Sequence, residues 1–220
     1  MICRSELTPP RHLVVEGPIG VGKTSLVQRL ADSFGSDALL EKTEENPFLE
    51  RFYMGGQQAA LPTQLFFLFQ RSKQLQELRQ RDMFRPSLVA DYMLEKDPLF
   101  ARLNLDDDEL KLYEQVFAHL TFEAPAPDLV VYLQAPVEIL MQRIKKRDRR
   151  EERPMKAGYL QKLCDAYAEF FYYYDASPLL IINAADINPV ERDADYQILL
   201  ERICTIRSGK HYFNPAPMLV

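Results

Sequence analysis

The chain has 220 residues and a mass of 25.6 kDa, which suits one well-packed α/β domain over residues 1–220 and is too short for two of ordinary size. Its net charge of -5, with 27% charged residues, gives no chain-wide basic surface for nucleic acid or an anionic membrane. Three scattered cysteines without C-x-x-C spacing indicate neither a disulfide framework nor a zinc site. With no signal-peptide pattern and no long apolar run, we expect a protein of the reducing cytoplasm with no membrane segment.

Short apolar runs alternate with longer helical patterns along the chain. The predicted strands are Leu13 to Glu16, Ala38 to Glu41, Ser87 to Asp91, Leu129 to Leu133 and Leu179 to Ile182. This alternation predicts an α/β fold, a parallel five-stranded sheet with helices on both faces. Ligands of such a sheet bind beyond the carboxyl ends of its strands, so the residues after each run are the candidates for chemistry. Residues 1–11 and 208–220 are expected to be tails.

A glycine-rich stretch, EGPIGVGKTSL from Glu16 to Leu26, follows the first predicted strand. It has the pattern G-x-x-x-x-G-K-S/T between a strand and a helix, which is typical of a phosphate-binding loop. Backbone N–H groups of the loop surround the phosphates, Lys23 spans the β- and γ-phosphates, and the Thr24 hydroxyl ligates magnesium. The pattern predicts ATP and Mg²⁺ binding by Gly17, Pro18, Ile19, Gly20, Val21, Gly22, Lys23, Thr24 and Ser25.

Two helical patterns are unusually apolar. The segment from Leu61 to Arg81 is apolar on more than one side, so we expect a second copy to cover it and the protein to be a homodimer. The segment AYAEFFYYYDASP gathers five consecutive aromatic residues at 170–174, which indicates core or interface and no catalytic role.

A charged stretch, QRIKKRDRREERP from Gln142 to Pro154, follows a helix that begins after Pro136. On its own such a run indicates a solvated surface. Beside a phosphate loop it predicts a lid at about residues 143–156, because arginines that close over ATP stabilise the charge of the phosphoryl group and exclude water. The lid arginines are Arg143, Arg147 and Arg149.

These motifs together resemble the deoxyribonucleoside kinase family, in particular its bacterial deoxyadenosine and deoxyguanosine kinase branch. The resemblance runs from about His12 to Ile203, and besides the loop and lid it rests on EKTEENPFLERFY, TQLFFLFQR, VADYMLEKDPLFA and PDLVVYLQAPVEIL. It implies a P-loop NTPase-type fold and a cytoplasmic enzyme of nucleotide salvage. It also implies transfer of the ATP γ-phosphate to the 5'-hydroxyl of a deoxynucleoside, most simply a purine one.

The resemblance assigns the general base to Glu41, which takes the proton of the 5'-hydroxyl. Glu44 and Glu45 compete for this role and are otherwise read as carboxylates at a helix start. We prefer Glu41 because it comes directly off the second predicted strand.

The nucleoside-binding residues also follow from the resemblance. Gln64 matches a glutamine that binds the base edge, and Arg71, two helical turns on, matches an arginine that helps to read it. Tyr53 and Glu152 match residues that contact the sugar 3'-hydroxyl. Without the resemblance, Gln64 and Arg71 are read as ordinary helix-surface polarity.

One position departs from the family pattern. An acidic residue followed by arginine is usual after the third strand, whereas this chain has Asp91 followed by Tyr92. Asp91 can still assist the magnesium shell. Lys96 can replace the missing charge, although an ammonium lacks the bidentate geometry of a guanidinium. Asp97 is an alternative partner for Arg71 at the base.

On the donor side, the resemblance places adenine near INAADINPVERD, with Asn183 and Asp186 as candidates. Alternatives to the deoxynucleoside kinase remain at this point. A thymidylate or other nucleoside monophosphate kinase shares the loop and lid but needs further cations for its acceptor phosphate. A GTPase is disfavoured because N-K-x-D is missing, and a non-catalytic nucleotide-binding module is disfavoured by the intact loop and lid.

Overall fold

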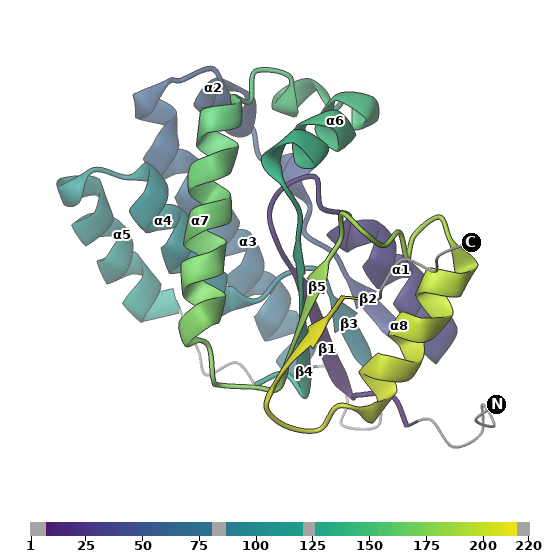
Figure 1. Ribbon diagram of the computed structural model, residues 1–220. Coiled ribbons are helices and arrows are strands. Elements are labelled where there is room, and N and C mark those ends of the chain that lie inside the picture. Colours follow the sequence, from purple (N-terminus) through teal and green to yellow (C-terminus); the bar gives the residue numbers. More distant parts are fainter. Residues whose placement is uncertain (1–7, 81–86, 121–125, 215–220) are drawn as a thin grey trace.

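A computed structural model describes residues 8–80, 87–120 and 126–214 of the chain. Its centre is a parallel sheet of six strands in the order β2-β3-β1-β4-β5-β6 (Figure 1). The strands are β1 (His12–Glu16), β2 (Asp37–Leu39), β3 (Leu88–Ala90), β4 (Leu129–Gln134), β5 (Leu179–Asn183) and β6 (Lys210–Phe213). The parallel α/β fold predicted from the sequence is therefore confirmed.

The sheet has one strand more than predicted. Residues Lys210–Phe213, which we assigned to a tail at 208–220, pair in parallel with β5 as β6. The alternating exposure of this short strand, at the edge of the sheet, leaves no continuous apolar run to reveal it. In addition, β2 ends at Leu39, so Glu41 lies two residues beyond its strand and not at its last position.

Helices cover both faces of the sheet. Figure 1 shows α1 (Lys23–Phe34) and α8 (Asp193–Thr205) on one side, with α3 (Ala60–Gln80), α4 (Asp97–Asn104), α5 (Asp107–Leu120) and α7 (Ala157–Tyr173) on the other. Two more helices, α2 (Leu49–Tyr53) and α6 (Val137–Arg147), lie near the carboxyl ends of the strands. Short 3-10 turns are η2 (Thr43–Glu45), η3 (Gln57–Ala59), η4 (Leu94–Lys96) and η5 (Arg150–Glu152).

The hydrophobic core lies along the middle of the sheet. The inner strands β1, β4 and β5 are buried on both faces and consist mostly of valine, leucine and isoleucine, the composition of a sheet covered by helices on both sides. A second apolar cluster around Leu68 and Tyr113 joins α3, α4 and α5. Of the aromatic segment, Phe171 is buried as predicted, while Tyr172 and Tyr173 are exposed. No helix among the described residues is both long and apolar enough to span a membrane.

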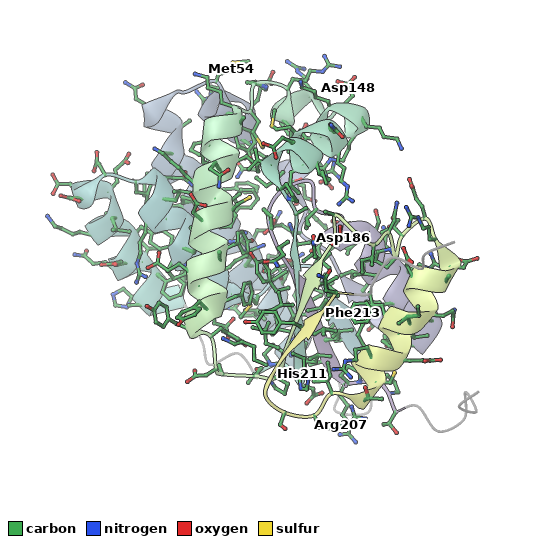
Figure 2. The ribbon with its side chains drawn as sticks, in the orientation of Figure 1. Met54, Asp148, Asp186, Arg207, His211 and Phe213 are labelled. Carbon is green, nitrogen blue, oxygen red and sulfur yellow. The ribbon has the colours of Figure 1, made fainter. Side chains whose placement is uncertain are left out.

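The carboxyl end of the sheet is flanked by α2 and by the turn after α6. Met54, directly after α2, and Asp148, directly after α6, lie at this end of the molecule, opposite Arg207 and His211 (Figure 2). Several residue pairs bring α2 and η5 together. The predicted lid is thus the end of α6, the turn at Asp148 and η5, and it faces α2.

Candidate active site

The phosphate loop connects β1 to α1 and has the backbone of an anion-binding turn. Gly17 has a φ of 148°, and a Cβ atom there would lie 2.3 Å from the carbonyl oxygen of Leu133, so only glycine fits. Gly22 precedes the first turn of α1 in a left-handed conformation. The ammonium of Lys23 donates to the carbonyl oxygens of Gly17 at 2.6 Å and Pro18 at 3.2 Å, which holds it across the loop.

Two clefts meet at this loop. The first is the acceptor cleft, whose polar lining residues include Lys23, Thr24, Glu41, Tyr53, Gln64, Arg71, Asp91, Lys96, Arg147, Arg149 and Glu152. The second, the donor cleft, lies over the loop and the start of α1 and is lined in part by Val21, Gly22, Ser25 and Arg143. Gly20 and Arg147 line both clefts, so two ligands bound in them meet at the phosphate loop. Residues predicted from distant parts of the sequence are therefore brought together.

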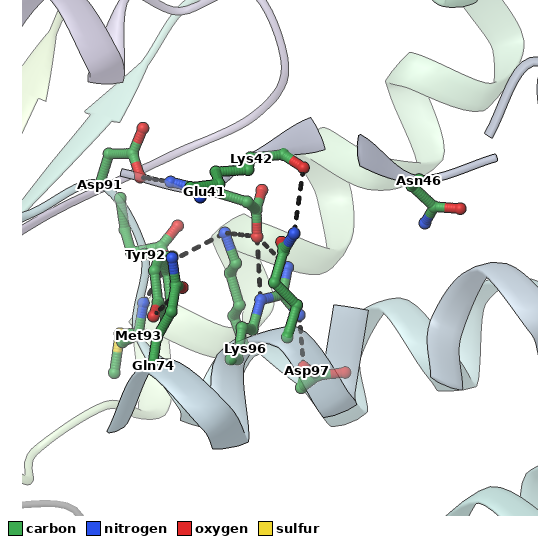
Figure 3. Close-up of polar contacts among 12 residues, drawn as sticks. Glu41, Lys42, Asn46, Gln74, Asp91, Tyr92, Met93, Lys96 and Asp97 are labelled. Carbon is green, nitrogen blue, oxygen red and sulfur yellow. Dashed lines mark hydrogen bonds and ion pairs between the residues drawn. The ribbon is translucent and has the colours of Figure 1, made fainter. Parts of the chain in front are cut away.

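The Glu41 carboxylate lies among the cations of the acceptor cleft. Arg71 donates to Glu41 Oε1 from Nε at 2.9 Å and also from Nη2, and Lys96 Nζ lies 3.6 Å from the same oxygen. Figure 3 shows Glu41 between Asp91 and Lys96, with one dashed line from its backbone N–H to Asp91 and another from its carboxylate to Lys96. Burial alone would raise the pKa of Glu41, but the charges of Arg71 and Lys96 outweigh it and lower this pKa to about 2. Glu41 is thus a carboxylate at neutral pH. Glu44 is exposed, and the choice of Glu41 over Glu44 as the general base stays a prediction.

Arg71 also binds Asp97, the alternative pairing considered from the sequence. Arg71 Nη1 donates to Asp97 Oδ2, and the buried Tyr113 hydroxyl donates to Asp97 Oδ1 at 2.8 Å. Burial would lower the pKa of Arg71, but Asp97 and Glu41 raise it well above its usual value. The guanidinium is therefore fixed in the cleft as a permanent cation, on the same helix as Gln64.

Asp91 and Thr24 form a small set of oxygen atoms beside the loop. Thr24 Oγ1 donates to Asp91 Oδ2 at 2.7 Å, and the Glu41 N–H donates to Asp91 Oδ1 at 2.7 Å. Burial raises the pKa of Asp91. Hydroxyl and carboxylate oxygens are donors that Mg²⁺ accepts, usually together with phosphate oxygens and water. Among the described residues no cluster of three or more histidine, cysteine or acidic side chains could hold a metal.

A carboxylate that the sequence analysis did not single out lies next to Lys96. Glu16 ends β1 and is fully buried. It accepts hydrogen bonds from the Met93 N–H at 2.8 Å and the Tyr167 hydroxyl at 3.0 Å, and Lys96 Nζ lies 3.4 Å from its Oε1. The available signal was its position, since a charged residue that ends a buried strand needs a partner.

The three lid arginines form hydrogen bonds with residues at the two clefts. Arg147 and Glu152 form a close pair, with Nη2 of Arg147 at 2.6 and 2.7 Å from the two carboxylate oxygens. Arg149 donates to Thr43 Oγ1 at 3.1 Å, across the acceptor cleft. Arg143 bonds instead to the Val21 and Ala184 carbonyl oxygens, at 3.1 and 2.8 Å, and so ties α6 to the phosphate loop and to the end of β5.

The sugar-contacting pair predicted from the resemblance is also brought together. Tyr53 from α2 and Glu152 from η5 line the same part of the acceptor cleft, with Tyr159 beside Tyr53. Burial, Tyr159 and Glu152 raise the pKa of Tyr53 well above its usual value, so its hydroxyl stays protonated.

The two donor-side candidates lie differently from the prediction. Asn183 Nδ2 donates to Asp186 Oδ2 at 2.6 Å, so these side chains bond to each other. The lining of the donor cleft comes from their neighbours, Ala184 and residues 187–191. Adenine binding by this segment, and by the Asn183 and Asp186 side chains, stays a prediction.

The family model described as deoxynucleoside kinase matches residues 13–206. The chain belongs to the deoxynucleoside kinase family. A deoxyguanosine kinase of Bacillus subtilis is 33% identical over 156 residues, which cover 70% of this chain and 75% of that enzyme. A deoxyadenosine kinase of Lactobacillus acidophilus is 28% identical over 204 residues, 86% of this chain and 93% of the other.

A solved structure supports the same family. The deoxyadenosine kinase from M. mycoides, with the products dCMP and a flexible dCDP bound, has a TM-score of 0.76 at 25% identity and covers 88% of this chain and 99% of its own. This kinase is therefore an enzyme that phosphorylates deoxynucleosides. The monophosphate kinase, GTPase and binding-module alternatives are set aside.

Proposed function

We propose that this kinase transfers the γ-phosphate of ATP to the 5'-hydroxyl of a purine deoxynucleoside. The bond between the 5'-oxygen and the γ-phosphorus forms, the bond from that phosphorus to the β,γ-bridging oxygen breaks, and ADP leaves. Glu41 takes the hydroxyl proton. The observation that carries the proposal is the position of the Glu41 carboxylate in one cleft with Lys23 and Thr24 of the phosphate loop.

The phosphates of ATP lie over the loop, with Lys23 as a cation for the β- and γ-phosphates. Thr24 and Asp91 are the residues that would hold Mg²⁺, which when bound neutralises charge on the phosphate oxygens. The adenine end lies in the donor cleft, against residues 187–191. The relatives named as deoxyguanosine and deoxyadenosine kinases support a purine acceptor.

The acceptor cleft orients the nucleoside from two sides. Gln64 and the Arg71–Asp97 pair bind the base, and Tyr53 with Glu152 binds the 3'-hydroxyl. The lid then closes with Arg147 and Arg149 toward the phosphates, which excludes water from the transfer. Arg143 contributes by holding the phosphate loop to β5.

The test is release of ADP from ATP and magnesium by the purified protein, with each deoxynucleoside and each matching monophosphate offered separately. We expect turnover with deoxyguanosine or deoxyadenosine and a far smaller response with the monophosphates. Turnover only with monophosphates would contradict the proposed acceptor. Turnover with pyrimidine deoxynucleosides alone would overturn the purine preference.

A cytoplasmic homodimer is a further part of this proposal. The described cysteines, Cys164 and Cys204, are free thiols, which suits a reducing compartment. On α3, Phe69 is 53% exposed although most of its apolar neighbours are covered, which supports contact with a second copy. Sedimentation of the purified kinase measures this directly, with twice 25.6 kDa as the expected mass.

A further inference from the structure

Lys96 is a buried cation of the acceptor cleft that belongs neither to the phosphate loop nor to the lid. Lys96 is 2% exposed, and its ammonium lies 3.4 Å from Glu16 and 3.6 Å from Glu41. Burial of a lysine is strongly unfavourable unless the charge is compensated. Both distances exceed the roughly 2.7–2.9 Å of a charge-assisted hydrogen bond, so the ammonium is shared between two carboxylates and committed to neither.

The ammonium of Lys96 faces the acceptor cleft. The residue ends η4, directly before α4, and its side chain lines the acceptor cleft on the side of Glu41. Lys23 lines the same cleft from the phosphate loop. A group that moves from the loop toward a hydroxyl at Glu41 therefore passes between two ammonium groups.

No cation directly follows Asp91 after strand β3. The residue that follows Asp91, just beyond β3, is Tyr92, which is neutral and buried and whose hydroxyl donates to Gln74 Oε1 at 2.6 Å. The Tyr92 and Phe100 rings each lie with their centroids 5.9 Å from Lys96 Nζ. These rings confine the ammonium and give it a weak electrostatic attraction without neutralising it.

We propose that Lys96 is a catalytic residue that stabilises the phosphoryl group in transit from the acceptor side, and that Glu16 is the positioning residue that holds it. This inference rests on the proposed function. During transfer the bond from the γ-phosphorus to ADP breaks, the bond to the 5'-oxygen forms, and the proton of the hydroxyl passes to Glu41. Lys96 Nζ lies 3.6 Å from Glu41 Oε1, so its charge faces the phosphoryl oxygens as the new bond forms beside Glu41. Such a contact is stronger in the transition state than in the ground state and raises kcat.

Glu16 suits the positioning role because its own place is fixed. Met93, Tyr167 and the neighbouring Gly17 N–H all donate to its carboxylate, which leaves it no freedom to follow the substrate. The carboxylate therefore holds Lys96 Nζ near Glu41 by attraction alone.

The test uses Lys96→Met with Lys42→Met as matched control. Lys42 is one residue from Glu41, but its side chain is 55% exposed and pairs with Glu45 at 3.1 Å. Three quantities are measured: kcat, the Kd of the best deoxynucleoside, and the Kd of its 5'-monophosphate, whose phosphate lies where the transferred group arrives. For Lys96→Met we expect kcat to fall about 100- to 1,000-fold, the size of loss seen when one transition-state donor is removed. We expect the monophosphate Kd to rise about tenfold and the nucleoside Kd to change less than about threefold.

A kcat within about threefold of the wild-type value would overturn the proposal, as would equal losses of affinity for nucleoside and monophosphate. If Lys96→Met does not fold, Lys96→Gln, which can still donate to Glu16, is measured against the same criteria. For Glu16→Gln, a lower kcat at unchanged KM is expected, and a raised KM at unchanged kcat contradicts positioning.

A wild-type protein without deoxynucleoside turnover would overturn the proposed function itself, whereas active wild type with equally active Lys96→Met would overturn this inference alone.

Discussion

Arg71 binds the Glu41 carboxylate through both Nε and Nη2, while its third nitrogen binds Asp97. One guanidinium thus connects the proposed general base to the part of the cleft proposed to bind the nucleobase. Arg71 lowers the pKa of Glu41. A nucleobase that attracts the Arg71 guanidinium therefore weakens this effect and makes the Glu41 carboxylate a stronger proton acceptor. We therefore expect recognition of the nucleoside and activation of its hydroxyl to be coupled through this residue.

Arg71→Met is expected to lower kcat/KM for the nucleoside about 100-fold or more, because the base loses a fixed partner and Asp97 is left as a buried unpaired carboxylate. Steady-state kinetics measure this, with the exposed Arg202→Met on α8 as the control. An Arg71→Met enzyme with unchanged kcat/KM would contradict the proposed role.

The pH dependence of kcat/KM follows from the pKa of Glu41. A carboxyl group whose folded pKa is lowered stays ionised until the pH falls through that value, here about 2. The wild-type profile should therefore show no acid limb from Glu41 between pH 7 and about pH 4. Removal of a cation raises the pKa of Glu41, so in Lys96→Met an acid limb should move toward neutral pH. An acid limb at lower pH in Lys96→Met than in the wild type would contradict the effect of Lys96 on the pKa of Glu41.

Gly17→Ala is expected to abolish ATP binding, because the added Cβ would lie 2.3 Å from the Leu133 carbonyl oxygen and force the loop to move. The matched control is Gly158→Ala on α7, where nothing lies within 4 Å of the added atom. That control should bind ATP normally and gain up to about 1 kcal/mol of stability from helix propensity. Calorimetric titration with ATP and thermal melting measure both effects. Normal ATP binding by Gly17→Ala would show that this loop is not the phosphate site.

Asp91→Asn is expected to raise the magnesium concentration needed for half-maximal activity by about tenfold, since a carboxylate holds the hard Mg²⁺ ion better than a carboxamide. A magnesium titration at saturating ATP measures it. Should the midpoint stay unchanged while kcat falls, Asp91 acts only by holding the Glu41 N–H and Thr24 hydroxyl.

Tyr53→Phe tests the contact with the sugar. The variant should lose about five- to tenfold in kcat/KM with a 2'-deoxynucleoside, the value of one hydrogen bond, and almost nothing with the matching 2',3'-dideoxynucleoside. Equal losses with both substrates would mean that Tyr53 serves packing with Tyr159 and not recognition of the 3'-hydroxyl.

Many residues of the acceptor cleft could be predicted from the sequence, because in a parallel sheet the residues after successive strands meet at one edge. This rule placed the phosphate loop, Glu41 and Asp91 together. Arg71 and Gln64 required the family resemblance, since polar residues on a helix are ordinary. The contact of Arg71 with Asp97 joins residues 26 positions apart and depends on how α3 packs on α4.

Other features depend on tertiary contacts that leave little local signal. Glu16 reads as the end of an apolar strand, and only the approach of Lys96 and Tyr167 shows why a carboxylate is there. The edge strand β6 lacks a long apolar run, and it forms because β5 offers unpaired backbone groups. The bonds of Arg143 to two carbonyl oxygens likewise cannot be read from the spacing of the lid arginines.

The most direct test of the central claim is formation of deoxynucleoside 5'-monophosphate from ATP by wild-type protein and Glu41→Gln, with the nucleoside Kd of both measured in parallel. We predict monophosphate formation by the wild type and a rate at least about 100-fold lower in Glu41→Gln, at a nucleoside Kd within about threefold, because the variant loses its base but keeps its cleft. Equal rates of product formation in the two proteins would contradict the assignment of Glu41 as the general base.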